Sequence, residues 1–290
     1  MTNNRTILIT GVTGHQGGAV AKALRSSGFR LLGLTRKPGG DAATALVQDG
    51  IDLVYGDFDD EASLRHALTG VWGVFGVQDA FAAGPEREQA QGKRLATLAR
   101  EAGVEHYVYT SVGSAHRRTG IPHFDSKWQI EEAVRGLRFP SHVILRPVFF
   151  MENLLEPYSL QDTTLTSALG SRTRLQMIAV DDIGWFGARA FTDASRLNRR
   201  EIDLAGDVRT MVEAAGILTE ALGRRIGYVQ TPIEQVRMYN NDVALMLEWL
   251  ERVGYSADTA SLEREFGRPL TKLPDWVRRH AGGLTQPSLR

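Results

Sequence analysis

Three closely spaced glycines near the start of the chain separate a short apolar segment from an amphipathic one. Residues 6–10 read Thr-Ile-Leu-Ile-Thr, the glycines follow at Gly11, Gly14 and Gly17, and residues 19–24 form an amphipathic run. This order predicts a strand, a tight turn and a helix. The spacing is G-x-x-G-x-x-G rather than G-x-G-x-x-G, and a glycine-rich turn by itself is common. Because both flanks fit, the segment favours dinucleotide binding over an ordinary turn.

Each glycine of this turn has a separate role in binding a diphosphate. Gly11 permits the turn, Gly14 lets the backbone approach the diphosphate, and Gly17 lets the helix pack closely on the strand. The free N–H groups at the N-terminus of the helix then face the anion, and His15 contributes its backbone N–H. The residues expected to contact the cofactor here are Gly11, Thr13, Gly14, His15, Gln16 and Gly17.

The end of the second predicted strand indicates which dinucleotide binds. NAD-binding units carry an acidic residue ~20 residues after the glycines, which accepts from the ribose 2′-hydroxyl. Residues 29–37 contain no acid, and Arg36 and Lys37 stand at that place. A guanidinium matches the 2′-phosphate of NADP. The alternative is a basic strand end that faces solvent. The position relative to the glycines favours NADP(H) as the cofactor, with Arg36 as the phosphate ligand.

Composition excludes several other classes of protein. Lysine plus arginine and aspartate plus glutamate each number 34, so the formal net charge is zero, and no overall field attracts nucleic acid or an anionic membrane. No apolar run is long enough to span a bilayer, and the first residues lack the hydrophobic stretch of a signal peptide. The absence of cysteine excludes disulfides and a thiolate nucleophile, and the histidine spacing fits no metal site. We therefore expect a cytoplasmic protein that binds a small molecule and no metal.

Predicted strands and helices alternate along the first half of the chain. The strands cover residues 6–10, 30–35, 52–56, 72–77, 105–110 and 142–146. The helices cover residues 16–27, 41–49, 61–68, 85–102 and 124–136. This alternation predicts an α/β fold with a doubly wound parallel sheet of the Rossmann type, which binds ligands beyond the carboxyl ends of its strands.

The pattern is looser from about Phe150. Residues 159–173 are small and polar and are predicted to form a loop, and residues 282–290 a frayed tail. Further predicted elements are a strand at 174–179, a helix at 181–192, a strand at 201–204, a helix at 209–222, and one strand with several helices from Arg225 to Ala281. We predict an NADP-binding Rossmann domain over residues 1–153. The rest, residues 154–290, is predicted to be a smaller α/β substrate or lid region, with some segments returning to the Rossmann sheet.

The segments after the third and fourth predicted strands carry polar residues that suit a nucleotide. Asp57 can accept from the exocyclic amine of adenine, and the backbone N–H of Phe58 can meet a ring nitrogen. The alternative is that this acidic run caps the next helix, and we expect that role for Asp59, Asp60 and Glu61. Strand order places Gln78 near the ribose and the diphosphate.

Taken together, these motifs resemble the NmrA-like family, a branch of the atypical short-chain dehydrogenase/reductases. The segments that carry the resemblance are Gly11–Gly17, Thr35–Pro38, Gly56–Asp60, His123–Lys127, Leu145–Leu154 and Ile178–Gly184. The resemblance implies an NADP-binding Rossmann domain and a smaller C-terminal domain that closes a cleft over the nicotinamide. It also implies pocket roles for Phe150 and Asn153. Members divide between reductases of quinones, enones or related carbonyl compounds and redox-sensing regulators without evident turnover.

The resemblance also identifies three catalytic candidates. Short-chain dehydrogenases place a tyrosine four residues before a lysine, with a serine on the preceding strand end; this chain keeps Lys127 and Ser111 but has His123 in place of the tyrosine. The imidazole of His123 is a potential proton donor. The alternative is that it fills a pocket wall or caps the helix, while Lys127 only clamps the ribose. Tyr107 and Tyr109 lie on the strand itself and are not expected to substitute.

Two functions therefore remain open from the sequence. One is an NADPH-dependent reductase of a quinone or conjugated carbonyl compound, a reaction in which the missing tyrosine matters less because product oxygens can take protons from water. The other is an NADP(H)-binding sensor that acts through a regulatory protein partner. The retained serine and lysine favour the reductase, and the lost tyrosine favours the sensor. A homodimer is a further alternative, and no direct contact with nucleic acid or membrane is expected.

Overall fold

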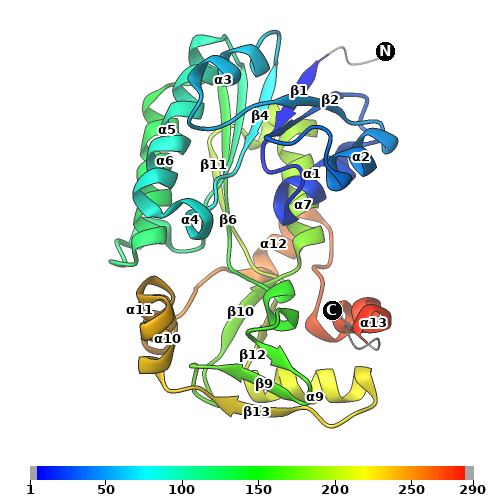
Figure 1. Ribbon diagram of the computed structural model, residues 1–290, viewed down its shortest axis with the longest axis vertical. Coiled ribbons are helices and arrows are strands. Elements are labelled where there is room, and N and C mark those ends of the chain that lie inside the picture. Colours follow the sequence, from blue (N-terminus) through cyan, green and yellow to red (C-terminus); the bar gives the residue numbers. More distant parts are fainter. Residues whose placement is uncertain (1–4, 285–290) are drawn as a thin grey trace. The chain divides into compact units, whose positions relative to one another are not determined.

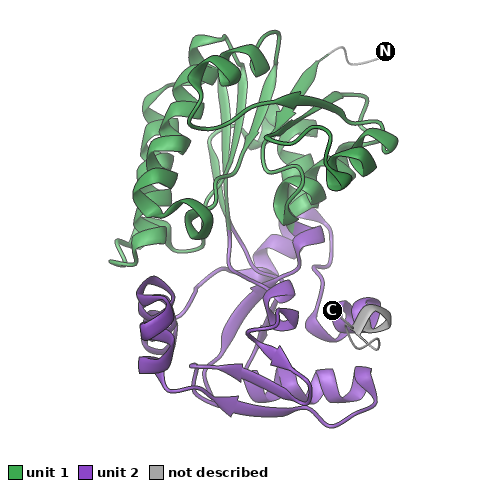
Figure 2. Cartoon of the chain, viewed as in Figure 1, with its two compact units in different colours: residues 1–146, 183–202 green, residues 147–182, 203–290 purple. Residues whose placement is uncertain are grey.

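The computed structural model describes residues 5–284, and the chain divides into two compact units. The first unit comprises residues 1–146 and 183–202, and the second comprises residues 147–182 and 203–290 (Figure 2). Residues 285–290 of the predicted tail lie outside the described residues, whereas residues 282–284 belong to the last helix, α13 (Leu273–Leu284). No helix of the described chain is long and apolar enough to cross a membrane.

A seven-stranded sheet forms the centre of the first unit (Figure 1). Its strands are β1 (Thr6–Ile9), β2 (Arg30–Thr35), β3 (Asp52–Tyr55), β4 (Gly73–Gly76), β5 (His106–Thr110), β6 (Ser141–Pro147) and β11 (Arg200–Leu204). Their order is β11-β6-β5-β4-β1-β2-β3, and the pairs between β3 and β6 are all parallel. The predicted doubly wound Rossmann-type sheet is confirmed. Strand order reverses at β1, which lies between β4 and β2, so ligands are expected at the carboxyl ends of these strands.

Helices cover both faces of this sheet because alternate strand residues are apolar on each side. The helices are α1 (His15–Leu24), α2 (Asp41–Gln48), α3 (Glu61–Ala67), α4 (Ala80–Ala83), α5 (Pro85–Glu101), α6 (Pro122–Gly136), α7 (Val180–Thr192) and α8 (Ala194–Leu197). On one face α3, α5 and α6 pack in a buried cluster with strand residues such as Leu8, Val74 and Ile144. Elsewhere in the unit α1 and α7 approach closely, because a Cβ on Gly184 would lie only 2.6 Å from the carbonyl oxygen of Ala19.

The second unit contains two three-stranded sheets and a set of helices. Its strands are β7 (Phe149–Phe150), β8 (Leu160–Gln161), β9 (Thr164–Ser167), β10 (Leu175–Ile178), β12 (Asp207–Arg209) and β13 (Gly227–Gln230). Its helices are α9 (Met211–Leu222), α10 (Ile233–Tyr239), α11 (Asn241–Arg252), α12 (Thr259–Phe266) and α13, with a 3₁₀ turn at Met151–Leu155. The carboxylate of Asp182 accepts from the backbone N–H of Thr271 at 2.8 Å and from Arg268 at 3.0 Å, which ties the C-terminal segment to the rest of the unit.

The predicted loop over residues 159–173 is wrong in part. It contains β8 and β9, which pair with each other in antiparallel fashion. The other partner of β9 is β13, and the parallel register joins Thr164 to Gly227. Because β13 lies far along the chain from β9, the pattern of apolar residues within 159–173 does not reveal β9, a polar strand that its pairing stabilises.

A buried histidine at the amino end of β5 makes the stability of the first unit dependent on pH. His106 is fully buried, its Nδ1 lies 2.9 Å from Ser141 Oγ, and its ring packs against Trp72 and Phe191 with centroid distances of 5.6 and 5.3 Å. Burial, as the main cause, lowers the pKa of His106 from 6.5 to about 4. The unfolded chain therefore binds this proton near pH 6.5 and the folded chain only near pH 4.

We expect His106 to contribute no pH dependence above pH 6.5 and to destabilise the fold progressively as the pH falls from 6.5 to about 4. The full loss is about 3 kcal/mol, because one pKa unit corresponds to ~1.4 kcal/mol. Urea unfolding at pH 7 and pH 4.5 measures the difference. His106→Gln should reduce that difference relative to wild type, and the exposed control His66→Gln should not. An unchanged difference in His106→Gln would contradict the prediction.

Candidate functional site

The turn between β1 and α1 has the backbone geometry that the glycines predict. Gly11 has a positive φ of 58°, which favours glycine. A Cβ on Gly17 would lie 2.3 Å from the carbonyl oxygen of Gly11 and 2.4 Å from that of Thr10, so no side chain fits. Gly14 is the N-cap of α1, and no side chain caps the helix. The first N–H groups of α1, from His15 onward, are therefore available to an anion.

Thr13 and His15 are exposed on this turn, and Gln16 is half-buried. The Oε1 of Gln16 accepts a hydrogen bond of 2.6 Å from Thr110 Oγ1, at the end of β5. This bond joins the first turn of α1 to the carboxyl edge of the sheet. The side-chain oxygen of Gln16 is thereby occupied, while its backbone N–H lies in the uncapped turn.

Arg36 follows β2 and is exposed, as a ligand for a 2′-phosphate requires. The turn that carries it is fixed by a hydrogen bond of 3.2 Å from the backbone N–H of Lys37 to Thr35 Oγ1. Among the residues that the structure describes, no carboxylate pairs with Arg36. Its guanidinium is therefore available for a ligand.

The segment after β3 is held by α5 as well as by its own turns. Asp57 is half-buried and its Oδ1 accepts from the backbone N–H of Asp59 at 3.0 Å. Arg94 donates to the carbonyl oxygen of Phe58 at 2.6 Å, and the Phe58 ring packs against the buried cluster. No described residue donates a hydrogen bond to the second carboxylate oxygen of Asp57.

The predicted capping role is confirmed for Asp60 and wrong for Asp59. Asp60 is the N-cap of α3 and accepts from the backbone N–H groups of Ala62 and Ser63 at 3.0 and 3.2 Å. Glu61 lies in the first turn. The Asp59 carboxylate instead accepts from Arg87, Gln91 and Arg94 of α5, and hydrogen bonding to Arg87, as the main cause, lowers the pKa of Asp59.

Two buried polar side chains follow β4 and β5, which are neighbours in the sheet, and have no partner among the described residues. Gln78 lies two residues after the end of β4, and Ser111 directly follows β5. Gln78 is 4% exposed and Ser111 is 3% exposed, yet within the described chain both amide atoms of Gln78 and the hydroxyl of Ser111 lack hydrogen bonds. Unsatisfied buried polar groups are costly. Their position at the edge of the sheet where the glycine turn lies fits a bound polar ligand.

His123 and Lys127 lie one turn apart on α6. The helix begins at Pro122 rather than at the predicted residue 124, so His123 is inside its first turn. His123 is 4% exposed, and its ring lies 5.2 Å from the ring of Phe81 and 4.8 Å from that of Phe124. Lys127 donates from Nζ to Glu88 Oε1 at 2.6 Å.

Glu88, on α5, is the site residue that the sequence analysis missed. Its side chain is fully buried, and its second oxygen accepts from Ser126 Oγ. The sequence contained a signal for this residue, because Glu88 lies at helical spacing from Gln91, Gly92 and Leu95, which are all buried. A carboxylate on such a face requires a cationic or hydrogen-bonding partner.

Tyr107 and Tyr109 are both fully buried within the cluster under α5 and α6. Burial is the main cause that raises the pKa of each, and neither hydroxyl has a hydrogen-bond partner among residues 5–284. This placement in the core is consistent with the expectation that neither tyrosine replaces His123.

Phe150 and Asn153 belong to the second unit, where both are half-buried. Their expected pocket role stays a prediction.

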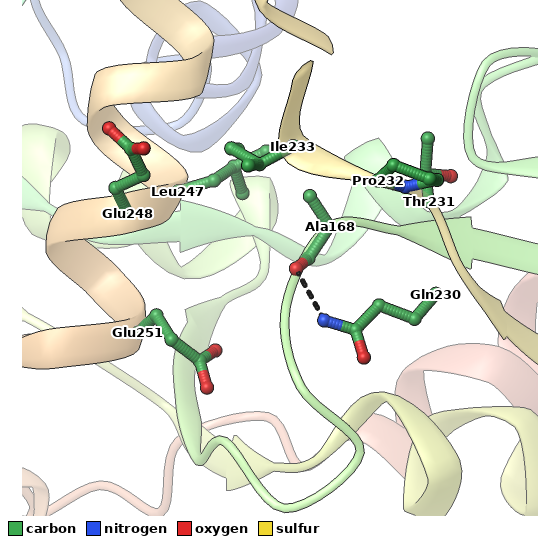
Figure 3. A pocket seen from close by; sticks show the side chains of 8 residues that line it. All are labelled: Ala168, Gln230, Thr231, Pro232, Ile233, Leu247, Glu248 and Glu251. Carbon is green, nitrogen blue, oxygen red and sulfur yellow. Dashed lines mark hydrogen bonds between the residues drawn. The ribbon is translucent and has the colours of Figure 1, made fainter. Parts of the chain in front are cut away.

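The second unit also has an open cavity of about 490 Å³. Its lining residues are Ala168, Gln230, Thr231, Pro232, Ile233, Leu247, Glu248 and Glu251 (Figure 3). Gln230 Nε2 donates to the Ala168 carbonyl oxygen at 3.1 Å (Figure 3). Glu248 pairs with Arg237, and Glu251 accepts from the backbone N–H of Gly170 at 2.9 Å.

No cluster of side chains suited to a metal ion occurs among the described residues.

The fold and the glycine turn of the first unit define a class of protein. It is a Rossmann-type α/β protein with an uncapped helix N-terminus at the switch point of its sheet. The family model of the NmrA-like family matches residues 3–279. The chain belongs to the NmrA-like family.

Similar proteins include enzymes and a regulator. An NmrA-like family domain-containing oxidoreductase from Aspergillus japonicus is 27% identical over 258 residues, which cover 80% of this chain and 78% of that protein. An NADPH-dependent quinone oxidoreductase from Escherichia coli has a similar structure, with a TM-score of 0.78, 24% identity, and coverage of 94% of this chain and 98% of that one. The negative transcriptional regulator NmrA, solved in complex with NAD, gives a TM-score of 0.80 at 18% identity, with 97% of each chain covered.

Proposed function

We propose that this protein is an NADPH-dependent reductase that transfers hydride to a quinone, an enone or a related carbonyl compound. The observation that carries the proposal is the pair of buried, unpartnered side chains of Gln78 and Ser111, at the sheet edge that also carries the glycine turn. Family membership, the oxidoreductase relative and the quinone oxidoreductase with a similar structure support it.

Different residues would bind different parts of the cofactor. The N–H groups at the start of α1 would bind the diphosphate, Arg36 the 2′-phosphate, and Asp57 with the backbone of Phe58 the adenine. Gln78 and Ser111 would satisfy their hydrogen bonds on the ribose, the nicotinamide or the substrate. When bound, the reduced nicotinamide supplies a hydride to the acceptor.

Proton supply is the step in which this chain differs from the short-chain dehydrogenases that it resembles. Lys127 would hold the ribose hydroxyls with an ammonium that Glu88 neutralises. We propose His123 as the proton donor to the substrate oxygen, oriented by its position one helical turn before Lys127. Reduction of a quinone takes up one hydride and one proton, so His123 is required to deliver a single proton in each turnover.

The test of the reductase proposal is NADPH oxidation, followed by absorbance, with 1,4-benzoquinone and a panel of conjugated carbonyl compounds as acceptors. We expect a rate that is proportional to protein concentration and saturates with acceptor. A Lys127→Met variant, which lacks the proposed contact with the ribose, should show a lower rate. NADPH binding without turnover across the panel would overturn the reductase proposal in favour of the redox sensor, which the similarity to NmrA and the absent tyrosine support.

Cofactor preference follows from the free guanidinium of Arg36. NADPH should bind at least tenfold more tightly than NADH, a difference of ~1.4 kcal/mol, and Arg36→Asp should abolish or reverse that preference. Titration calorimetry with both cofactors measures it. Arg30→Gln, at the other end of β2, should leave the preference unchanged. Equal affinities of the wild-type protein for the two cofactors would eliminate the NADP assignment.

A further inference from the structure

Glu88 is a fully buried carboxylate whose two oxygens are bound by consecutive residues of the neighbouring helix. Oε1 accepts from Lys127 Nζ at 2.6 Å, and Oε2 accepts from Ser126 Oγ. Its side chain has no solvent-accessible surface. A buried carboxylate is stable only with a charge partner or a full set of hydrogen bonds, and Glu88 has both.

The Lys127 ammonium is anchored on one side and open on the other. Its side chain is 13% exposed, and Glu88 satisfies one of its three N–H donors. Its remaining two donors have no acceptor within the part of the chain that the structure describes. The contact with Glu88 therefore restricts where these two donors can point.

A second buried carboxylate in the same unit provides a comparison. Glu131 lies four residues after Lys127 on α6 and is also fully buried, but it accepts from Arg146 Nε at 2.9 Å and from Arg135 at 2.6 Å. Arginine presents a planar, rigid fork of donors to a carboxylate, whereas the lysine ammonium is a compact charge on a flexible stem. The position of the Lys127 ammonium therefore depends on its partner more than the positions of the two guanidinium groups do.

We propose that Glu88 is the positioning residue of the cofactor site: its contact with the Lys127 ammonium directs the two free N–H groups of Lys127 toward the ribose hydroxyls. This inference rests on the cofactor site of the proposed function. The helix that carries Glu88 also holds the adenine-side segment, through the bonds from Arg87 and Arg94 to Asp59. Helix α5 thereby connects two contacts of one ligand.

The test is NADPH affinity measured by titration calorimetry for the wild type and Glu88→Gln. The glutamine keeps the length of the side chain but removes the charge, and its one carbonyl oxygen can replace only one of the two oxygens that accept from Lys127 and Ser126. We expect at least tenfold weaker binding than wild type, because the Lys127 ammonium is no longer held toward the ribose. In a Lys127→Met background, which already lacks the ammonium, Glu88→Gln should cause no further loss of affinity.

Three further variants separate positioning from simple structural support. Glu131→Gln, the matched control, should lower the melting temperature without changing the affinity for NADPH. Ser126→Ala removes a hydrogen bond to Glu88 but keeps the charge pair, so its affinity should stay close to that of the wild type. Glu88→Asp retains the charge at a shorter reach, so it should bind NADPH more weakly than wild type and more tightly than Glu88→Gln.

Two results would overturn the inference: Glu88→Gln with wild-type affinity for NADPH, or an equal loss of affinity in Glu131→Gln. The readout is binding, so it does not depend on turnover. A protein whose NADPH affinity falls as expected in Glu88→Gln, but which reduces no acceptor, would refute the reductase and support the role of Glu88.

Discussion

His123→Ala is expected to lower the rate of NADPH oxidation by about 10²- to 10⁴-fold while leaving NADPH affinity nearly unchanged. The reason is that His123 lies one turn before Lys127, where the related dehydrogenases place their proton-donating tyrosine, and its imidazole carries a proton that alanine cannot replace. Steady-state rates and titration calorimetry on the same samples measure both effects.

Two substitutions at the same position separate proton donation from packing. His123→Phe keeps an aromatic ring against Phe81 and Phe124 but has no proton to give, so it should be as slow as His123→Ala. His123→Tyr restores the tyrosine of the short-chain dehydrogenases and should retain turnover. If His123→Ala and His123→Phe turn over at near-normal rates per folded molecule, solvent rather than His123 is the proton source.

Gly17→Ala is expected to weaken NADPH binding by about 10- to 100-fold. Its Cβ would lie 2.3 and 2.4 Å from two backbone carbonyl oxygens, so the turn between β1 and α1 must shift and the N–H groups of α1 move away from the diphosphate. Strain of this kind costs ~1–3 kcal/mol, and each ~1.4 kcal/mol corresponds to a factor of ten in affinity. Titration calorimetry measures the affinity, and thermal unfolding measures the cost to the fold.

The control for that substitution is Gly216→Ala on α9. Gly216 is exposed, and a Cβ there would meet nothing within 4 Å. Alanine has the higher helix propensity, so this variant should be slightly more stable, by up to ~1 kcal/mol, with unchanged NADPH affinity. Wild-type affinity in Gly17→Ala would argue against the glycine turn as the diphosphate site.

Several contacts of the candidate site arise from pairs of residues that no local pattern connects. The bond between Gln16 and Thr110 joins a helix to a strand 94 residues further along the chain, and Lys127 pairs with Glu88 across 39 residues. Asp59 was expected to cap α3 because a run of acids precedes that helix, but three side chains of α5 bind it instead. A carboxylate bonds to whichever donors the fold brings near it, and helix packing selects those donors.

The amino-acid sequence alone was sufficient to predict the central sheet, its flanking helices and the glycine turn. These features depend on short-range patterns: apolar runs over a few residues, helical spacing, and glycines at fixed offsets. The predicted strands of the first half of the chain lie within two residues of the observed ones. The pairing of β9 with β13, the contact of the His123 ring with Phe81 and the bond between Lys127 and Glu88 emerged only from the tertiary structure, because each depends on a partner that long-range packing brings close.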